Sequence, residues 1–378
     1  MTQPLPLPPA PAAHPATAHS PVAFPLTWLL DHACGPIQYR AVAEVARAPS
    51  DVAYNFAALA YGHEAALWLA MTQSIDGGWN QSMFSLPTAK QTHGAGVGTM
   101  HAVRRLLEFG WDKESPPLVQ ARRLLFRLLA EDNDPKYLFE LAPTKGATVE
   151  SNRRSRLILR EASAALLAQA GYEQDPRLRG AARRLVERAG NYLKSPLAAK
   201  PWVRVGNKQV LHADATPPST WLLWMLSFMP HFRAEHHEHV ELIYHHLTQP
   251  MPRQEPVQMI GDKLLLQPHL VLGDELPHRN AVEADIPKAL QWLELMARMG
   301  FLKRNENWLK MFDRFLDDRD SQGVWHPHKG SSAPRTTNPF AWGMFPLEPP
   351  GAGDERWVDV TFRIGLIARL AGRPIALT

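Results

Sequence analysis

Two histidines that follow a predicted turn are the most direct candidates for acid–base chemistry. His326 and His328 lie two residues apart, directly after Trp325, and Trp342 follows a little later in the sequence. An imidazole changes its charge near neutral pH, so either ring could act as a general base, and the pair could supply two nitrogen ligands. The alternative is a pair of exposed loop histidines beside a structural tryptophan.

A glycine-rich segment provides a second candidate. In residues 91–98, His93 precedes three alternating glycines, which would allow a ligand to approach the backbone closely. No strand is predicted before this segment, so it does not match a dinucleotide-binding fingerprint. A simple lead-in to the next helix is the alternative interpretation.

A third candidate places a carboxylate before an aromatic helix. Asp214 precedes a segment that contains Trp221 and Trp224 among leucines and methionines. The faces of aromatic rings stabilise positive charge, so such a wall would suit a cationic or apolar ligand. The same stripe at helical spacing also occurs in ordinary helix cores.

Two polar clusters complete the survey. The histidines of residues 236–246 have some spacings that suit a metal, but they do not form the His-Glu-x-x-His motif, and we expect a solvated face without metal. Arg153, Arg154, Arg156 and Arg160 form the densest basic patch. They could hold phosphate or diphosphate, or they could simply begin a helix.

Helical periodicity dominates the elements that must position these residues. Apolar residues recur at helical spacing in three clear stretches, 118–128, 178–186 and 286–297, with charged residues such as Glu294 and Arg298 expected outside. Acidic residues before prolines, as at Asp175 and Asp285, are typical of helix starts. No stretch shows sustained strand alternation with turn signals at both ends, so we expect little β-structure.

A faint internal repeat links two helix ends. Residues 67–79 read as a helix that runs into Asp76-Gly-Gly-Trp79, and residues 309–325 end in Asp320-x-x-Gly-x-Trp325. Glycine permits a sharp turn, the carboxylate can bond neighbouring amides, and the indole can pack across the gap. Repeated helix pairs predict an all-α protein, either a closed α/α toroid or an open α-solenoid.

These motifs resemble those of a known superfamily. The segment from Gln73 to Trp79 resembles the Gln-Trp type repeat of the prenyltransferase and squalene-cyclase superfamily, and Asp320 to Trp325 resembles a degenerate copy. The segment 36–45 resembles the opening of uncharacterised bacterial proteins with this repeat. The resemblance implies an α/α toroid, whose members act on isoprenoid substrates in a central pocket.

The chain departs from the known chemistries of that superfamily. It has no Asp-x-Asp-Asp acid motif, since Asp317-Asp318-Arg319-Asp320 has an arginine inside it, and no Asp-Asp-x-x-Asp motif. Its single cysteine, Cys34, excludes a cysteine-based zinc cluster and an intrachain disulfide. A toroid with this sequence would therefore lack the best-known reactions of its relatives.

Composition defines the broad class. The 378 residues are 45% hydrophobic and 21% charged, with a net charge of +4, so a sizeable core is expected and general disorder is excluded. Residues 1–25 are rich in proline and alanine and predict a flexible extension without a secretory signal, followed by one domain over 26–378. The longest apolar run, 221–230, is too short to span a bilayer, and we expect a cytoplasmic protein.

The leading functional hypothesis is a terpenoid-cyclase-like enzyme that acts on an apolar or isoprenoid-like small molecule in a central aromatic pocket by acid–base or cation-stabilising chemistry. The alternatives are a sugar-active toroid lyase or hydrolase, and a non-catalytic scaffold that binds a protein or nucleic acid. We expect no cofactor, and the sequence leaves the oligomeric state open. The predicted catalytic residues are Asp76, His93, Asp214, His326 and His328, and the predicted substrate-binding residues are Trp79, Trp221, Trp224, Trp325 and Trp342.

Overall fold

The structure is a computed structural model that describes most of the chain. The described residues are 20–86, 96–130, 149–261, 263–276, 285–327, 334, 336, 338, 340, 347–348 and 353–378. Three predicted site residues, His93, His328 and Trp342, lie outside these ranges.

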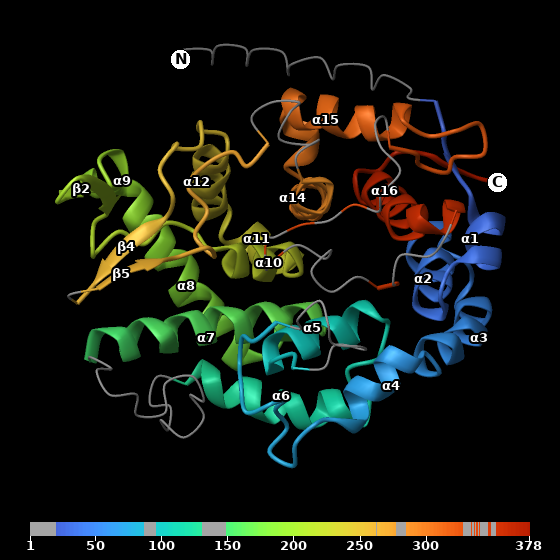
Figure 1. The fold of residues 1–378 in the computed structure, drawn as a ribbon, viewed down its shortest axis with the longest axis horizontal. Helices are drawn as coiled ribbons and strands as arrows, with labels where there is room; N and C mark the ends of the chain where they lie inside the picture. The colour runs from blue at the N-terminus through green and yellow to red at the C-terminus, as the bar shows by residue number, and fades with distance from the viewer. Residues whose placement is uncertain are drawn as a thin grey trace, which may run out of the picture.

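The described part of the chain is predominantly helical (Figure 1). The α-helices are α1 (Leu26–His32), α2 (Gly35–Arg40), α3 (Ser50–Tyr61), α4 (Glu64–Met71), α5 (Thr99–Glu108), α6 (Pro116–Leu129), α7 (Val149–Gln169), α8 (Pro176–Lys194), α9 (Pro196–Ala199), α10 (Thr220–Ser227), α11 (Pro230–Glu235), α12 (His237–Leu247), α14 (Ile286–Arg298), α15 (Glu306–Asp317) and α16 (Val358–Leu370). A π-helical turn η1 (Ala41–Ala46) extends α2, and short 3₁₀ turns occupy η4 (Leu302–Arg304) and η6 (Gly353–Trp357).

Two small sheets correct the prediction of a strictly all-α fold. Four strands form one sheet in the order β2 (Trp202–Val205), β3 (Lys208–Leu211), β4 (Val257–Ile260) and β5 (Lys263–Leu266). The pairs β2–β3 and β4–β5 are antiparallel, and β3 meets β4 in parallel at a single pair, Leu211 and Gln258. Gly206 and Gly261, both with positive φ, lie in the turns of the two hairpins. These hairpins were not predicted from the sequence, because helical periodicity dominates the surrounding sequence.

The second sheet joins the two ends of the described chain. Strand β1 (Val22–Phe24) pairs in parallel with β6 (Ile375–Leu377). Val22 and Phe24 are buried. Strand β1 therefore lies inside the segment 1–25 for which the sequence predicts a flexible extension.

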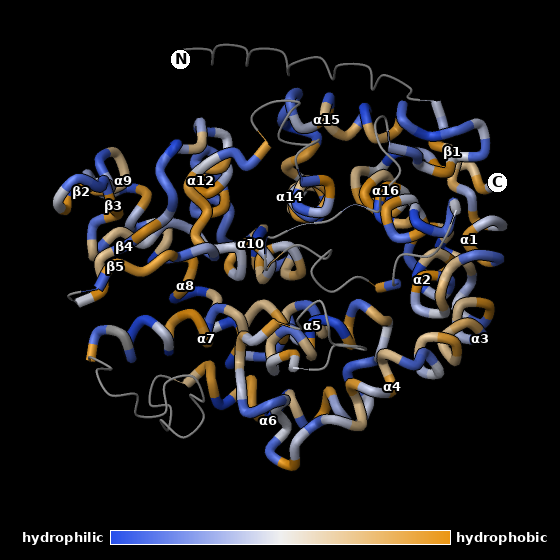
Figure 2. Tube along the Cα trace, viewed as in Figure 1, coloured by the Kyte–Doolittle hydropathy of each residue, from blue (hydrophilic) through white to orange (hydrophobic). Residues whose placement is uncertain are grey.

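Local sequence explains where several helices begin and which face they bury. The Asp175 side chain accepts a hydrogen bond from the Arg177 backbone N–H at the start of α8, and the Asp285 side chain accepts one from Lys288 at the start of α14. The apolar stripes predicted in 118–128 and 178–186 are buried. Figure 2 shows the resulting alternation of apolar and polar residues along the helices.

Helix α14 differs from the prediction on its polar side. Its apolar residues are buried as expected, but Glu294 is only 5% exposed and forms ion pairs, although it was expected to face outward. Both faces of α14 are covered because the helix packs between α10 and α16. Its charged side therefore faces other protein groups instead of bulk water.

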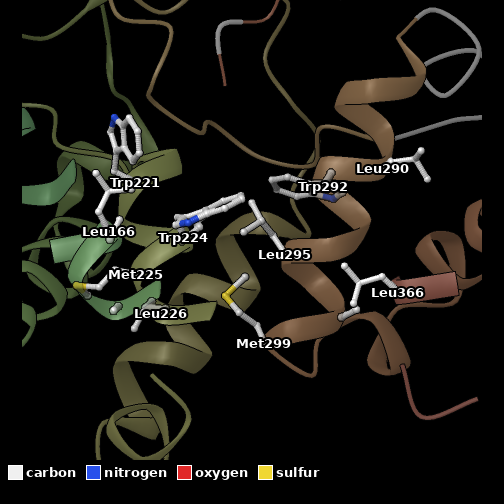
Figure 3. Close-up of a cluster of buried hydrophobic side chains, with 14 of the residues drawn as sticks. Leu166, Trp221, Trp224, Met225, Leu226, Leu290, Trp292, Leu295, Met299 and Leu366 are labelled. Atoms are coloured by element: carbon white, nitrogen blue, oxygen red, sulfur yellow. The ribbon is translucent and has the colours of Figure 1, made fainter. Parts of the chain in front are cut away.

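Contacts between helices lead around the molecule and back to their starting point. In succession, α2 packs on α3, α3 on α4, α4 on α5, α5 on α7, α7 on α10, α10 on α14, α14 on α16, and α16 on η1. One large cluster of buried apolar residues runs through these helices. Figure 3 shows part of it, where Trp224 of α10 points toward Trp292 and Leu295 of α14.

Candidate functional site

A cavity of about 640 Å³ lies where the inner helices converge. Helices α2, α5, α10, α14 and α16, which surround the middle of the view in Figure 1, all contribute side chains to it, together with η1 and α3. Its volume falls in the range of small-molecule sites, about 300–1,000 Å³. Its aromatic lining residues are Tyr39, Tyr54, Tyr61, Trp111, Trp224 and Phe228, and its charged lining residues are Arg40, Glu44, Glu108, Asp112, Lys113, Glu294, Arg298 and Arg363.

One group of ion pairs centres on Glu108 at the end of α5. Its carboxylate lies 2.9 Å from Arg104 and 2.9 Å from Arg105. The backbone carbonyl of Glu108 also accepts a hydrogen bond of 3.1 Å from Arg40, which pairs with Glu44 at 2.5 Å. These contacts connect α5 to α2 and η1.

A second group connects α14 to α16. The Glu294 carboxylate lies 2.9 Å from Arg298 on its own helix and 3.6 Å from Arg363 on α16. Arg363 pairs in turn with Asp359 at 2.8 Å. Because these side chains are almost fully buried, each charge needs its partners to offset the loss of hydration.

The ion pairs set the protonation state of the cavity wall. Burial disfavours the charged form of Glu108, but Arg104 and Arg105 outweigh it and hold its pKa well below the usual value. Burial also acts on Glu44, where Arg40 prevails and lowers the pKa. Both carboxylates are therefore ionised and can accept hydrogen bonds from a ligand, but they are poor proton donors at neutral pH.

Two of the aromatic side chains, Trp224 and Phe228, are held by neighbouring groups. The guanidinium of Arg104 lies 4.1 Å from the ring centroid of Trp224, whose indole N–H donates a 2.9 Å hydrogen bond to Gln169. Arg298 lies 4.5 Å from the centroid of Phe228. Such contacts place flat apolar surfaces beside the charged groups and reduce the freedom that a ligand would have to remove.

Among the predicted residues that the structure describes, Trp224 lines this central cavity. Asp214 lines a different cavity, beside α8, where its side chain is 79% exposed. Trp221 is buried and packs near Phe84, His101 and Phe340, with ring centroids 5.6–6.2 Å away. The predicted residues are thus not gathered into one site.

The first predicted corner serves the fold. The exposed Asp76 side chain accepts a 3.1 Å hydrogen bond from the Gly78 N–H within the turn. Trp79 is 2% exposed, donates from its indole to the Leu69 carbonyl at 2.8 Å, and donates from its backbone to the Thr99 hydroxyl at 3.0 Å. Trp79 fills the core between α4 and α5 and is absent from the central cavity wall.

The second corner shares the backbone hydrogen bonds of the first but differs at the indole, because the buried Trp325 Nε1 has no hydrogen-bond partner among the described residues. The backbone N–H of Trp325, a residue that is 1% exposed, donates to the Thr361 hydroxyl at 3.1 Å. His326 lies 3.1 Å from Asp320, and the two side chains are 38% and 40% exposed. The turn hydrogen bonds also correspond, since Gly77 donates to Ser74 at 2.9 Å and Gly323 donates to Asp320 at 3.0 Å.

The sequence interpretation missed most of the central site. Many of the charged residues around this cavity share one pattern that it missed, an arginine and an acidic residue four positions apart on the inner helices. These pairs are Arg40 and Glu44, Arg104 and Glu108, Glu294 and Arg298, and Asp359 and Arg363. This spacing is common on helix faces that are exposed to solvent. Only its recurrence on several helices could have indicated that these charged faces meet in the interior of the protein.

Comparison of the chain with family models, curated proteins and solved structures gives no match. Among the described residues, no helix combines the length and apolarity required to cross a bilayer. The same residues contain no group of three or more histidine, cysteine or acidic side chains placed to hold a metal ion.

Proposed function

We propose that the chain forms an α/α toroid and binds a hydroxyl-rich, sugar-like small molecule in its central cavity. Two observations support the toroid. The circuit of helix contacts returns to its start, and the β1–β6 pairing brings the ends of the described chain together. The two corners share their backbone turn bonds and the bond from the tryptophan backbone N–H to a threonine hydroxyl, which supports an internal repeat.

The cavity lining is the observation that supports the ligand class. Its described residues include four basic and four acidic side chains, so their formal charges balance. A neutral ligand with many hydroxyl groups can donate to the carboxylates and accept from the guanidinium groups without adding a charge. The six aromatic rings provide flat apolar surfaces against which a sugar ring can pack.

An isoprenoid-like ligand, which the family resemblance implies, fits this lining less well. Hydrocarbon placed against ionised groups removes their remaining water and returns no hydrogen bonds. The pKa values of Glu44 and Glu108 lie below the usual ones, because neighbouring arginines outweigh burial. The pKa of Tyr39 lies above its usual value, chiefly because of burial. All three pKa values are thus moved further from pH 7, whereas an acid–base catalyst needs a pKa near the working pH. The shifts therefore favour binding as the role of the cavity wall.

The test is calorimetric titration of the purified full-length chain with mono- and oligosaccharides, and in parallel with prenyl diphosphates and a squalene-like hydrocarbon. We expect a carbohydrate to bind. Tyr54→Ala, which removes a ring at the cavity mouth, should weaken binding roughly threefold to tenfold through lost packing. Met71→Ala is the control, because Met71 is 83% exposed on the neighbouring helix and does not line the cavity.

A second variant tests the carboxylates. Glu44→Gln keeps the side-chain shape but replaces a charged acceptor, and it should weaken sugar binding about tenfold. Glu306→Gln is its control, because the Glu306 side chain is 89% exposed on α15. Binding of isoprenoids but not sugars, with the same sensitivity to Tyr54→Ala, would overturn the proposed ligand class.

A further inference from the structure

A second cavity, of about 610 Å³, lies at the start of α7 and is unusually basic. Four arginines of α7 and one of α8 line it, together with Thr216 from the loop before α10. The arginines are Arg153, Arg154, Arg156, Arg160 and Arg188. Among the described residues that line it, none is acidic.

Helix geometry explains why these arginines meet. Arg153, Arg156 and Arg160 follow spacings of three and four residues, which place them on one side of α7. Helix α8 packs against α7 and contributes Arg188. An adjoining cavity of about 430 Å³ shares Arg188 and Thr216 with the first.

Among the described residues, the carboxylates near this cavity are fewer than its arginines. Glu150 forms ion pairs with both Arg153, at 2.8 Å, and Arg154, at 2.7 Å. Glu161 lies behind the cavity, is 8% exposed, and accepts a 2.5 Å hydrogen bond from Ser219. Asp214, whose side chain is 79% exposed, also acts on Arg153. Among the described residues, five guanidinium groups therefore lie near three carboxylates, so positive charge predominates.

The electrostatic consequences appear at two buried groups. Burial lowers the pKa of Arg188; Glu161 partly offsets the effect, and Arg154, Arg153 and Arg160 lower it further by repulsion. Burial lowers the pKa of His269 to about 4, with further contributions from Arg188 and Arg154. Burial is the largest cause of both pKa shifts, and repulsion from the neighbouring arginines adds to it.

Arg154 and Arg156 are placed differently. Arg154 is held in position, since it donates to Gln258 at 3.0 Å and to the Ala213 carbonyl. Gln258 is 1% exposed and also bonds the Ala215 carbonyl at 2.8 Å, which fixes the loop that carries Thr216. The Nε atom of Arg156 is buried and has no hydrogen-bond partner among the described residues.

We propose that this cavity binds the diphosphate group of a small molecule. Guanidinium groups bind phosphate oxygens through paired, charge-assisted hydrogen bonds, and a diphosphate carries several negative charges and oxygens that can reach more than one arginine. A recessed cavity suits a compact anion better than a long polyanion such as a nucleic acid. The site is distinct from the central cavity, since the two share none of the lining residues that the structure describes.

Calorimetry on the full-length chain tests the site, with inorganic pyrophosphate, orthophosphate and a nucleoside diphosphate as separate probes. We expect pyrophosphate to bind at least tenfold more tightly than orthophosphate, because it reaches more guanidinium groups. Comparison with the nucleoside diphosphate distinguishes a site for the diphosphate alone from one that also contacts an organic group. Absence of binding by both diphosphates at millimolar concentration would overturn the proposal.

Arg156→Gln is the variant that tests the site. The Nε atom of Arg156 has no hydrogen-bond partner among the described residues, so the substitution removes a positive charge without breaking a bond at that atom. It should weaken pyrophosphate binding roughly tenfold and, without ligand, should raise the melting temperature by relieving repulsion. Arg183→Gln is the matched control, with the same charge change on α8 at a side chain that is 66% exposed and outside both cavities. It should change affinity less than twofold.

Two outcomes would contradict this assignment. Equal weakening by Arg156→Gln and Arg183→Gln would show general surface electrostatics instead of a site. Tighter binding of a single-stranded oligonucleotide than of pyrophosphate, with a steep salt dependence, would assign the basic region to nucleic acid.

Discussion

The Arg363 guanidinium of α16 lies 3.6 Å from the Glu294 carboxylate of α14, and both side chains are more than nine-tenths buried. Arg363 also binds Asp359, and Glu294 also binds Arg298. The charges of two neighbouring helices are thus satisfied within one network. Removal of a single member leaves its partners buried without full compensation.

Replacement of Glu294 by glutamine should therefore destabilise the protein. The change keeps the shape of the side chain but leaves Arg298 without its carboxylate, and we expect a loss of roughly 3 kcal/mol in the free energy of unfolding. Urea denaturation of the two proteins measures it. Glu306→Gln is the control, because its pair with Lys310, at 3.8 Å, is exposed. Similar losses in both variants would show that the buried network adds no particular stability.

Stability should fall as the pH drops from about 6.5 toward 4. The pKa of His269 is lowered from 6.5 to about 4, chiefly by burial and then by Arg188 and Arg154. In this interval the unfolded chain binds a proton that the folded protein does not, so this stabilisation is complete above pH 6.5 and is lost on acidification. The part of this loss that is due to His269 should be roughly 3 kcal/mol at pH 4.

The variant His269→Gln tests this origin of the pH dependence. Chemical denaturation at a series of pH values should give a flatter profile for His269→Gln than for the parent protein. His245→Gln, at an exposed histidine of α12, should leave the profile unchanged. An unaltered slope in His269→Gln would contradict the assignment.

The two corners should be equally sensitive to loss of a hydroxyl. Thr99→Val removes the hydroxyl that accepts a hydrogen bond from the backbone N–H of Trp79, and Thr361→Val does the same for Trp325. Each should cost about 1–3 kcal/mol, because a buried donor is left without a partner. Thermal or urea unfolding measures both, with Thr72→Val, at an exposed helix end, as the control. A large effect at one corner and none at the other would argue against equivalent corners.

The glycines of the corners should not tolerate a side chain. At Gly323, with φ of 97°, a Cβ atom would lie 2.8 Å from the Ala23 carbonyl oxygen. Gly323→Ala should cost more than Gly171→Ala, because Gly171 has a similar φ of 84° but nothing within 4 Å of its Cβ position. The Gly171 variant measures the backbone strain alone, about 1–2 kcal/mol. Equal costs would show that the approach of Ala23 is unimportant.

Sequence periodicity predicted the helices well where one face is apolar and the other charged. The stripe of α8, with Leu178 and Leu185 inward, is an example. The same reasoning placed Glu294 outside, because a charge on a helix is normally solvated. Periodicity reports the angle of a residue around its helix, but it does not report whether a second layer of protein covers that side.

The hairpins were missed for a different reason. Val205-Gly206-Asn207-Lys208 contains a glycine–asparagine pair between short alternating segments, which is a recognised hairpin pattern. The strands beside it have only four residues each, so the alternation is brief. Apart from Trp224, the lining of the central cavity was not predicted, because it comes from helices far apart in the chain and depends on the order in which they pack.

The parallel pairing of β1 with β6 has a consequence for biosynthesis. A strand that begins at Val22 finds its partner only after residues 375–377 have emerged from the ribosome. Helices such as α7 and α8 can pair early, since they are neighbours in the chain. Until residues 375–377 have been translated, β1 therefore has an unpaired edge, which is open to chaperones or to a second copy of the chain.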